Sequence, residues 1–467
     1  MVWLDEVALC DPGRELAQHG TLRSSVYGDF PGFERRYFWQ PPGQALVAAA
    51  CYKLFGFGVW QTRIPGLLFG AAALAIIYLL AWRLLEDSLA AAFAAAILGL
   101  YPAFIATARA ARMDTECLFF VLLATAFYLE GHWRPSRTYL CYGASGLSLG
   151  LAGMFHPIAV FWAAALGSLV LLIGGEGRFL KLGWLAFCAS LFPLLWLGWA
   201  FSTPDLFRIQ FLSHGMAHLV KGTLAQRLGS EIYVDVGNNL RVPTLLAAYA
   251  AGTIWVLFFA RLRWDVKVIL ATLFSVPFTL IAIFMVKGAG PYYLYPVSVL
   301  TLCAGSMLAR LWKAGIASVP RWSRTALMSL PILLFANLFA AGLGGRWLML
   351  ACQYRERNYQ QVEAPVRAMI PKGSIVLGPA QAWYAVINAG ASLRLQSVNF
   401  DVSQPPTQAN PRVHDFVFRW SSKSLNESLP GFHEVQRIGA PLPPLFGRFR
   451  VSDSADYQLE IWKSDFR

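Results

Sequence analysis

The charged side chains of this 467-residue chain that could do chemistry are few and fall at separate places. Asp5 and Glu6 form an acidic pair in the opening apolar run MVWLDEVALC, which holds no Lys or Arg. Asp114 follows Arg109 and Arg112 in the segment ARAARMDTE. Carboxylates and arginines are the residue types that move protons and stabilise anions. Charges near membrane depth are costly and usually functional, so these places are candidate sites.

The segment around Arg109 allows two interpretations. If it is helical, the spacing puts Arg109, Arg112 and Glu116 on one face, and Asp114 points elsewhere. The alternative is a solvated interfacial turn with local ion pairs. Both interpretations stay open at this stage.

Later segments add a histidine, a lysine and two tyrosines to the candidates. His156 precedes Pro157 at the junction of two apolar stretches, and Lys287 lies in KGAGPYY just before Tyr292 and Tyr293. Tyr and Lys also favour the membrane interface, so the last three residues could equally be an interfacial anchor.

The composition determines what kind of molecule must position these residues. Hydrophobic residues make up 57% of the chain and charged residues 14%, against about 25% charged in soluble proteins. This composition predicts a polytopic membrane protein. The net charge of +13 would suggest nucleic acid in a soluble chain, but here the positive-inside rule accounts for it. We therefore expect no nucleic-acid partner.

About ten apolar stretches are long enough to cross a bilayer. They are residues 62–84, 89–107, 116–131, 138–155, 157–174, 182–201, 242–260, 268–286, 291–310 and 326–346. Alternate loops carry the Lys and Arg residues, which predicts that these loops are cytoplasmic. The N-terminal segment, the candidate residues above and the C-terminal tail then lie outside.

The first 61 residues are expected to lie on the external surface. The stretch 42–57, PGQALVAAACYKLFGF, is apolar but short, and it has Lys53 near its end. A membrane crossing here would reverse every later loop, so we predict a helix lying along the surface. Residues 1–346 then form the membrane domain.

The tail from residue 347 to 467 changes character. It has no spanning segment and is rich in Arg, Gln, Asn and Pro. The runs SIVLG and DFVFRW are typical of strands, and GPAQAWYAVINAG is typical of a turn followed by a helix. We predict a small external α/β domain of roughly 110 residues.

His214 and His218, in HGMAH, have the i,i+4 spacing at which two histidines on one helix can bind the same metal ion. No carboxylate completes the motif at a standard offset, so a histidine pair without metal is favoured.

Four segments together resemble the GT-C class of polytopic glycosyltransferases, in the branch of protein O-mannosyltransferases and the aminoarabinose transferases that modify lipid A. They are LDEVALCDPGRELAQHG, YFWQPPGQALVAAACYKLFGFGVWQTRIPGLLFG, ARAARMDTECLFF and GPYYLYPVSVL. Their order and spacing carry the resemblance, which extends to about residue 310. Members of this branch usually have a transmembrane helix before the acidic pair, and we expect that helix to be missing from the sequence as given.

The resemblance implies transfer of a monosaccharide from a polyprenyl-phosphate donor, with inversion, on the external side of a bacterial inner membrane. It implies Asp5 as general base with Glu6 beside it, and Asp114 as the second acidic position. Cations would stabilise the departing lipid phosphate. The expected substrate contacts are Lys53, Arg63, Arg109, Arg112, His156, Lys287, Tyr292 and Tyr293. His156 stands where relatives often have Lys.

Several questions stay open from the sequence. The acceptor is expected to be lipid A, another glycan or a protein hydroxyl. No cofactor is required by the residues, and a divalent metal is left open. The main alternative function is a transporter or flippase for a lipid-linked saccharide, which should show inverted repeats and ionisable residues at the midplane. A membrane scaffold without activity is the third hypothesis.

Overall fold

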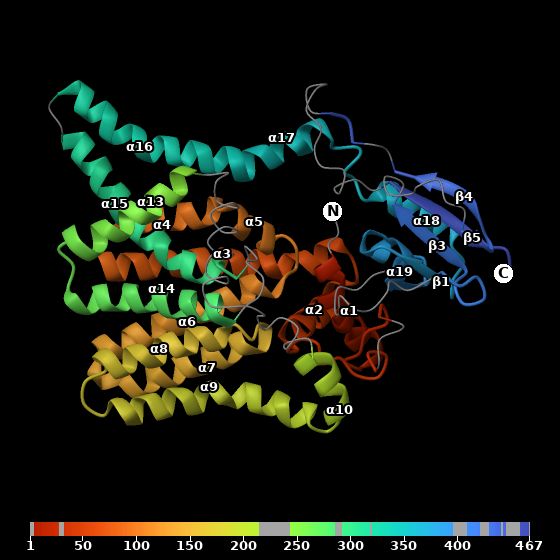
Figure 1. Ribbon diagram of the computed structural model, residues 1–467, viewed down its shortest axis with the longest axis horizontal. Helices are drawn as coiled ribbons and strands as arrows, with labels where there is room; N and C mark the ends of the chain where they lie inside the picture. The colour runs from red at the N-terminus through yellow and green to blue at the C-terminus, as the bar shows by residue number, and fades with distance from the viewer. Residues whose placement is uncertain are drawn as a thin grey trace.

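The computed structural model is a bundle of long helices with a small β-sheet at one end (Figure 1). The structure describes residues 4–27, 32–213, 243–284, 292–317, 320–395, 409–420, 429–439, 442–444 and 458–466. The predicted class, mainly α with a small C-terminal α/β part, is confirmed.

Each predicted apolar stretch coincides with a helix. The helices are α3 (Val59–Leu85), α4 (Ser88–Leu100), α5 (Pro102–Ala108), α6 (Met113–Trp133), α7 (Thr138–Phe155), α8 (Ala159–Ile173), α9 (Arg178–Ala200), α13 (Pro243–Ile254) with η3 (Trp255–Phe259), α14 (Trp264–Phe284), α15 (Leu294–Ala317) and α16 (Arg321–Phe339). The last of these continues through η4 (Ala340–Gly344) into α17 (Gly345–Cys352), past the predicted domain boundary at 346.

Not every helix meets the requirements of a membrane span by itself. Among the described residues, five helices are long and apolar enough to cross a bilayer. The pair α4 and α5, bent by 65° at Tyr101, could form a sixth. The residue after the bend is Pro102, which cannot donate the backbone hydrogen bond that would continue α4. The number of about ten spans stays a prediction.

Small residues allow close packing inside the bundle. A side-chain carbon on Gly305 of α15 would come within 2.6 Å of the carbonyl oxygen of Ala90 in α4, so only glycine fits there. Such contacts hold the helices at fixed separations. The loop residues at the ends of the helices consequently lie at fixed positions.

Two helices lie across one end of this bundle, α1 (Leu4–His19) and α2 (Gly43–Phe55) (Figure 1). They touch at Gly13, where a Cβ would meet the carbonyl oxygen of Ala45 at 2.6 Å. The helix predicted at 42–57 is therefore present, and it is not among the candidate spans. Beyond α9, the short α10 (Pro204–Phe207) and η2 (Arg208–Leu212) lie near the same end.

The C-terminal part forms a five-stranded sheet in the order β2-β1-β3-β5-β4. Its strands are β1 (Ile375–Gly378), β2 (Ser392–Leu395), β3 (Phe416–Trp420), β4 (Phe432–Ile438) and β5 (Leu459–Ser464), with helices α18 (Gln360–Met369) and α19 (Trp383–Asn388). β1 is parallel to β2 and β3, and β5 is antiparallel to β3 and β4. Both predicted strands and the predicted helix are confirmed. The backbone N–H of Leu395 donates to the carbonyl of Val26 at 2.9 Å, which ties the sheet to the segment after α1.

Candidate active site

The acidic pair lies in the first turn of α1. This position is electrostatically favourable, because the amide groups at a helix N-terminus carry partial positive charge. The two side chains differ sharply in exposure: the Asp5 side chain is 41% exposed, whereas Glu6 is fully buried. The same pair therefore presents one accessible carboxylate and one enclosed carboxylate.

Glu6 is occupied by partners from two distant parts of the chain. Its carboxylate accepts hydrogen bonds from Arg63, on α3, with Nη2 to Oε2 at 2.9 Å. It also accepts from the hydroxyl of Tyr384, on α19, at 2.6 Å. Glu6 thus joins α1, the helix bundle and the C-terminal part at one point, and its partners leave it poorly placed to accept a further proton from a substrate.

Arg112 bridges the two aspartates of the site. Its Nη1 donates to Asp5, and its Nε donates to Asp114 at 2.8 Å. Burial alone would lower the pKa of Arg112, but the carboxylates of Asp114 and Asp5 raise it above its ordinary value. The guanidinium therefore stays charged and holds both carboxylates in place.

The helical interpretation of segment 109–116 is wrong. α5 ends at Ala108, and α6 begins only at Met113. Between them Ala111 adopts a left-handed backbone with φ of +48°, which L-residues rarely adopt. This turn directs Arg112 back toward Asp114, the residue that the helical alternative had pointed elsewhere.

The acidic side chains at the start of α6 are buried, and only some of their oxygens accept hydrogen bonds. Asp114 and Glu116 are both fully buried. One oxygen of Asp114 and both oxygens of Glu116 have no hydrogen-bond partner among the described residues. Buried polar groups are normally paired, so this unsatisfied set marks the helix start as a site rather than a structural core.

His156 and Tyr292 lie against the same aspartate. The two rings meet edge to face, with centroids 5.5 Å apart. Burial lowers the pKa of His156, an effect that the nearby carboxylate of Asp114 partly offsets. The Nδ1 atom of His156 accepts a hydrogen bond from the backbone of Ile158, which fixes the ring. Tyr293 is buried beside them and packs on Phe278 instead.

A group of arginines forms the positive part of the site. The pKa of Arg109 lies below its ordinary value, first because surrounding protein shields the guanidinium from water, although the residue keeps an open surface. Repulsion from Arg346, Arg63 and Arg357 lowers it further. These three arginines therefore lie within electrostatic reach of Arg109. The Nη1 of Arg346 is buried and has no hydrogen-bond partner among the described residues.

The sequence analysis missed Tyr384, Arg346 and Arg357. Arg346 could have been found, since a single arginine at the end of an apolar stretch is a functional signal. No sequence signal marks Tyr384, which reaches Glu6 only because the C-terminal part folds back.

Of the remaining predicted residues, the structure describes only Lys53. Lys53 lies near the end of α2, its side chain is exposed, and it forms no ion pair with the described residues of this site. Lys287, His214 and His218 lie outside the described residues. The residues that are described hold no group of three His, Cys, Asp or Glu side chains able to bind a metal ion. A metal site thus stays a prediction.

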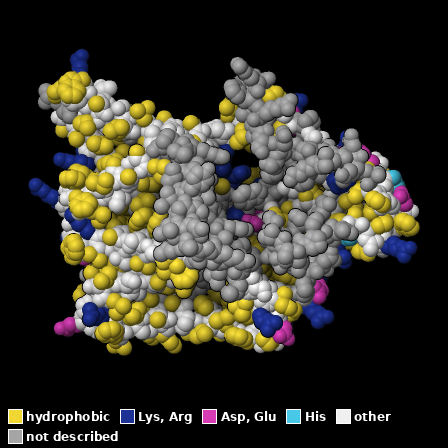
Figure 2. All heavy atoms as spheres, viewed as in Figure 1, with side chains coloured by type: hydrophobic (Ala, Val, Ile, Leu, Met, Phe, Trp, Pro, Cys, Tyr) yellow, Lys and Arg dark blue, Asp and Glu magenta, His cyan; other side chains and the backbone are white. Residues whose placement is uncertain are grey.

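Figure 2 shows a hollow between the helix bundle and the C-terminal part, with basic and acidic side chains visible inside it. Such a hollow could admit a polar head group while the flanking helices remain against lipid.

Comparison with known proteins is consistent with this geometry. Residues 39–199, about a third of the chain, match the family described as dolichyl-phosphate-mannose-protein mannosyltransferase. No curated protein matches the sequence.

Three solved structures have a similar fold. ArnT from Cupriavidus metallidurans, bound to undecaprenyl phosphate, superposes with a TM-score of 0.63 at 16% identity, over 99% of this chain and 94% of that one. The mycobacterial arabinofuranosyltransferase AftD superposes with a TM-score of 0.54 at 14% identity, over 99% of this chain and 38% of that one. The oligosaccharyltransferase AglB from Archaeoglobus fulgidus superposes with a TM-score of 0.50 at 12% identity, over 83% of this chain and 60% of that one.

The fold is that of the GT-C class of polytopic membrane glycosyltransferases, as the sequence resemblance predicted. The matched segment 39–199 is similar to the protein mannosyltransferase family.

Proposed function

We propose that this protein transfers a monosaccharide from a polyprenyl-phosphate donor to an acceptor hydroxyl, at the end of the bundle that carries Asp5. The matched family is named for a dolichyl-phosphate-mannose donor. The ArnT and AglB structures are described with undecaprenyl phosphate and dolichol phosphate. Both ligands join a long polyprenyl chain to one phosphate, and a chain of this kind suits a bundle of apolar helices.

The exposure of Asp5 is the observation that carries the assignment of the base. Its side chain is 41% exposed, while Glu6 and Asp114 are fully buried. A general base must come within hydrogen-bond reach of the hydroxyl that it deprotonates. Among these three carboxylates only Asp5 meets that requirement, and Arg112 holds it in position.

The reaction then follows as a single displacement. The acceptor hydroxyl gives its proton to Asp5 while its oxygen bonds to the anomeric carbon of the sugar. The bond from that carbon to the phosphate oxygen breaks, so the configuration inverts and the polyprenyl phosphate leaves with one more negative charge. Arg109, Arg346 and Arg357 are suited to stabilise this charge, because preformed cations act most strongly where charge develops.

We place the site on the periplasmic side of a bacterial inner membrane, since the basic loops belong to the opposite end of the helices. Lipid A, another glycan or a protein hydroxyl is the proposed acceptor. A divalent metal is compatible with the resemblance, but no step above depends on one.

The proposal is tested by sugar transfer in membranes that contain equal amounts of each variant. Asp5→Asn keeps the shape of the side chain and removes the base, so transfer should fall by about 100-fold or more. Glu34→Gln is a matched control, since Glu34 is an exposed carboxylate after α1. Equal transfer by Asp5→Asn and the control would refute the assignment.

A further inference from the structure

A second charged cavity lies at the opposite end of the same helices. It has a volume of about 570 Å³ and is formed where α3 and α6 end and where η3 turns into α14. Arg63 of the candidate active site and Arg83 of the cavity both lie on α3, and the rise of an α-helix puts these two places about 30 Å apart. The cavity size falls within the usual range for ligand sites, about 300–1,000 Å³.

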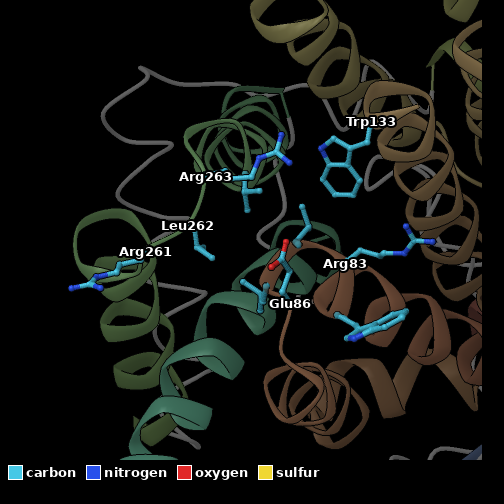
Figure 3. Close-up of a pocket in the computed structure, with 10 residues that line it drawn as sticks. Arg83, Glu86, Trp133, Arg261, Leu262 and Arg263 are labelled. Atoms are coloured by element: carbon cyan, nitrogen blue, oxygen red, sulfur yellow. The ribbon is translucent and has the colours of Figure 1, made fainter. Parts of the chain in front are cut away.

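The chemical groups of this cavity are of both signs (Figure 3). Its polar and aromatic lining residues are Trp82, Arg83, Glu86, Trp133, Arg261 and Arg263. Figure 3 shows the carboxylate of Glu86 below the side chain of Arg263, whereas the guanidinium groups of Arg83 and Arg261 point away from it. Trp133 lies across from Arg263 in the same view.

The charges are unevenly compensated. Arg263 pairs with Asp265 at 2.8 Å, and Arg83 lies 3.8 Å from Glu130. Glu86 forms no ion pair with any residue that the structure describes. It therefore offers a negative charge that has no ion-pair partner among the described residues, in a cavity that Arg83 and Arg263 also line.

Trp133 adds an unused hydrogen-bond donor. Its indole Nε1 is buried and has no partner among the described residues. A buried donor without a partner is costly, and a ligand oxygen would satisfy it. Arg263 and Trp133 together suit a phosphate, and Glu86 suits an ammonium group close to that phosphate.

The surroundings favour a lipid over a soluble ligand. Large aromatic side chains are exposed next to the cavity: Trp82 by 47%, Phe258 by 75%, Phe259 by 66% and Trp264 by 77%. Tryptophan is enriched at the level of lipid head groups. The predicted cytoplasmic loops carry ten basic and four acidic residues, so this end suits the phosphate layer of a membrane.

We propose that this cavity binds the head group of an aminophospholipid from the leaflet at the basic end. The phosphate is held by Arg263 and the indole N–H of Trp133, and the primary ammonium is held by Glu86. A purely anionic head group is disfavoured, because it would place its charge beside the carboxylate of Glu86 without an ammonium to offset it.

The test uses the full-length protein, purified, delipidated and observed by native mass spectrometry. Three phospholipids with identical acyl chains are offered in competition, with ethanolamine, choline or glycerol head groups. We expect the ethanolamine lipid to be retained roughly tenfold better than the glycerol lipid, the effect of one charge-assisted hydrogen bond. Choline, which has no N–H donor, should fall between them.

Glu86→Gln should abolish the preference for ethanolamine over glycerol, while Glu176→Gln, an exposed carboxylate in another basic-end loop, should keep it. Trp133→Phe preserves the ring and removes the donor, so retention of all three lipids should fall severalfold, with unchanged elution in size exclusion. Equal retention of the three lipids by wild type would overturn the proposal. So would an unaltered preference in Glu86→Gln, or displacement of the lipid by millimolar inorganic phosphate.

Discussion

The bridge made by Arg112 allows a quantitative prediction, because its two carboxylates differ in burial. Asp114 is fully buried, whereas the Asp5 side chain is 41% exposed. Arg112→Gln leaves the Asp114 charge enclosed and uncompensated, which costs roughly 3–5 kcal/mol. Asp5→Asn removes only the exposed partner, so it should cost about 1 kcal/mol or less.

The measurement is thermal unfolding of the purified variants in one detergent. Unfolding is monitored as the loss of the monodisperse size-exclusion peak after heating. Arg109→Gln is the matched control, since Arg109 forms no ion pair with any described residue and its charged neighbours are mostly cations. We expect Arg112→Gln to be clearly the least stable of the three, and Arg112→Gln combined with Asp114→Asn to recover part of the loss. Equal stability of Arg112→Gln and Arg109→Gln would refute the bridge.

Three further predictions concern the rest of the site. Tyr384→Phe removes a hydroxyl that donates to buried Glu6, so stability should fall by about 1–3 kcal/mol, and limited proteolysis should release the C-terminal part more readily than in Tyr359→Phe. Arg346→Gln should raise the KM for the donor severalfold with little loss of stability; an unchanged KM would remove Arg346 from the phosphate site. Burial lowers the pKa of His156, so the folded state binds fewer protons than the unfolded state there, and stability should be full above about pH 6.5 and decline below it. Unfolding of His156→Gln measured against pH should lose that part of the acid sensitivity, and an identical pH profile would contradict the burial effect.

Much of the architecture could be predicted because local patterns determine it. The apolar stretches gave the positions of the bundle helices, and the short strand-type runs SIVLG and DFVFRW gave two strands of the sheet. The bend after α4 was not predicted, since the sequence shows Pro102 but not whether the helix continues past it.

The candidate site was predicted only in part. The sequence analysis singled out Asp5, Glu6, Arg63, Arg112 and Asp114, and the structure brings them together in three ion pairs, Arg63–Glu6, Arg112–Asp5 and Arg112–Asp114. It had expected both arginines to contact the substrate instead. The spacing of these residues in the sequence did not predict which of them pair, because the left-handed turn at Ala111 reverses the chain before α6.

Contacts across long separations could not be predicted either. The partner of Glu6 in the C-terminal part is 378 positions away along the chain. Arg346 likewise comes near Arg109 because η4, which precedes α17, packs against α5.

The central claim is that Asp5 is the base of a sugar transfer from a polyprenyl-phosphate donor. The most direct measurement uses purified protein with a radiolabelled polyprenyl-phosphate sugar and membrane extract as acceptor. The account predicts transfer by wild type, loss of transfer in Asp5→Asn and unchanged donor binding in that variant. Full transfer by Asp5→Asn would contradict it.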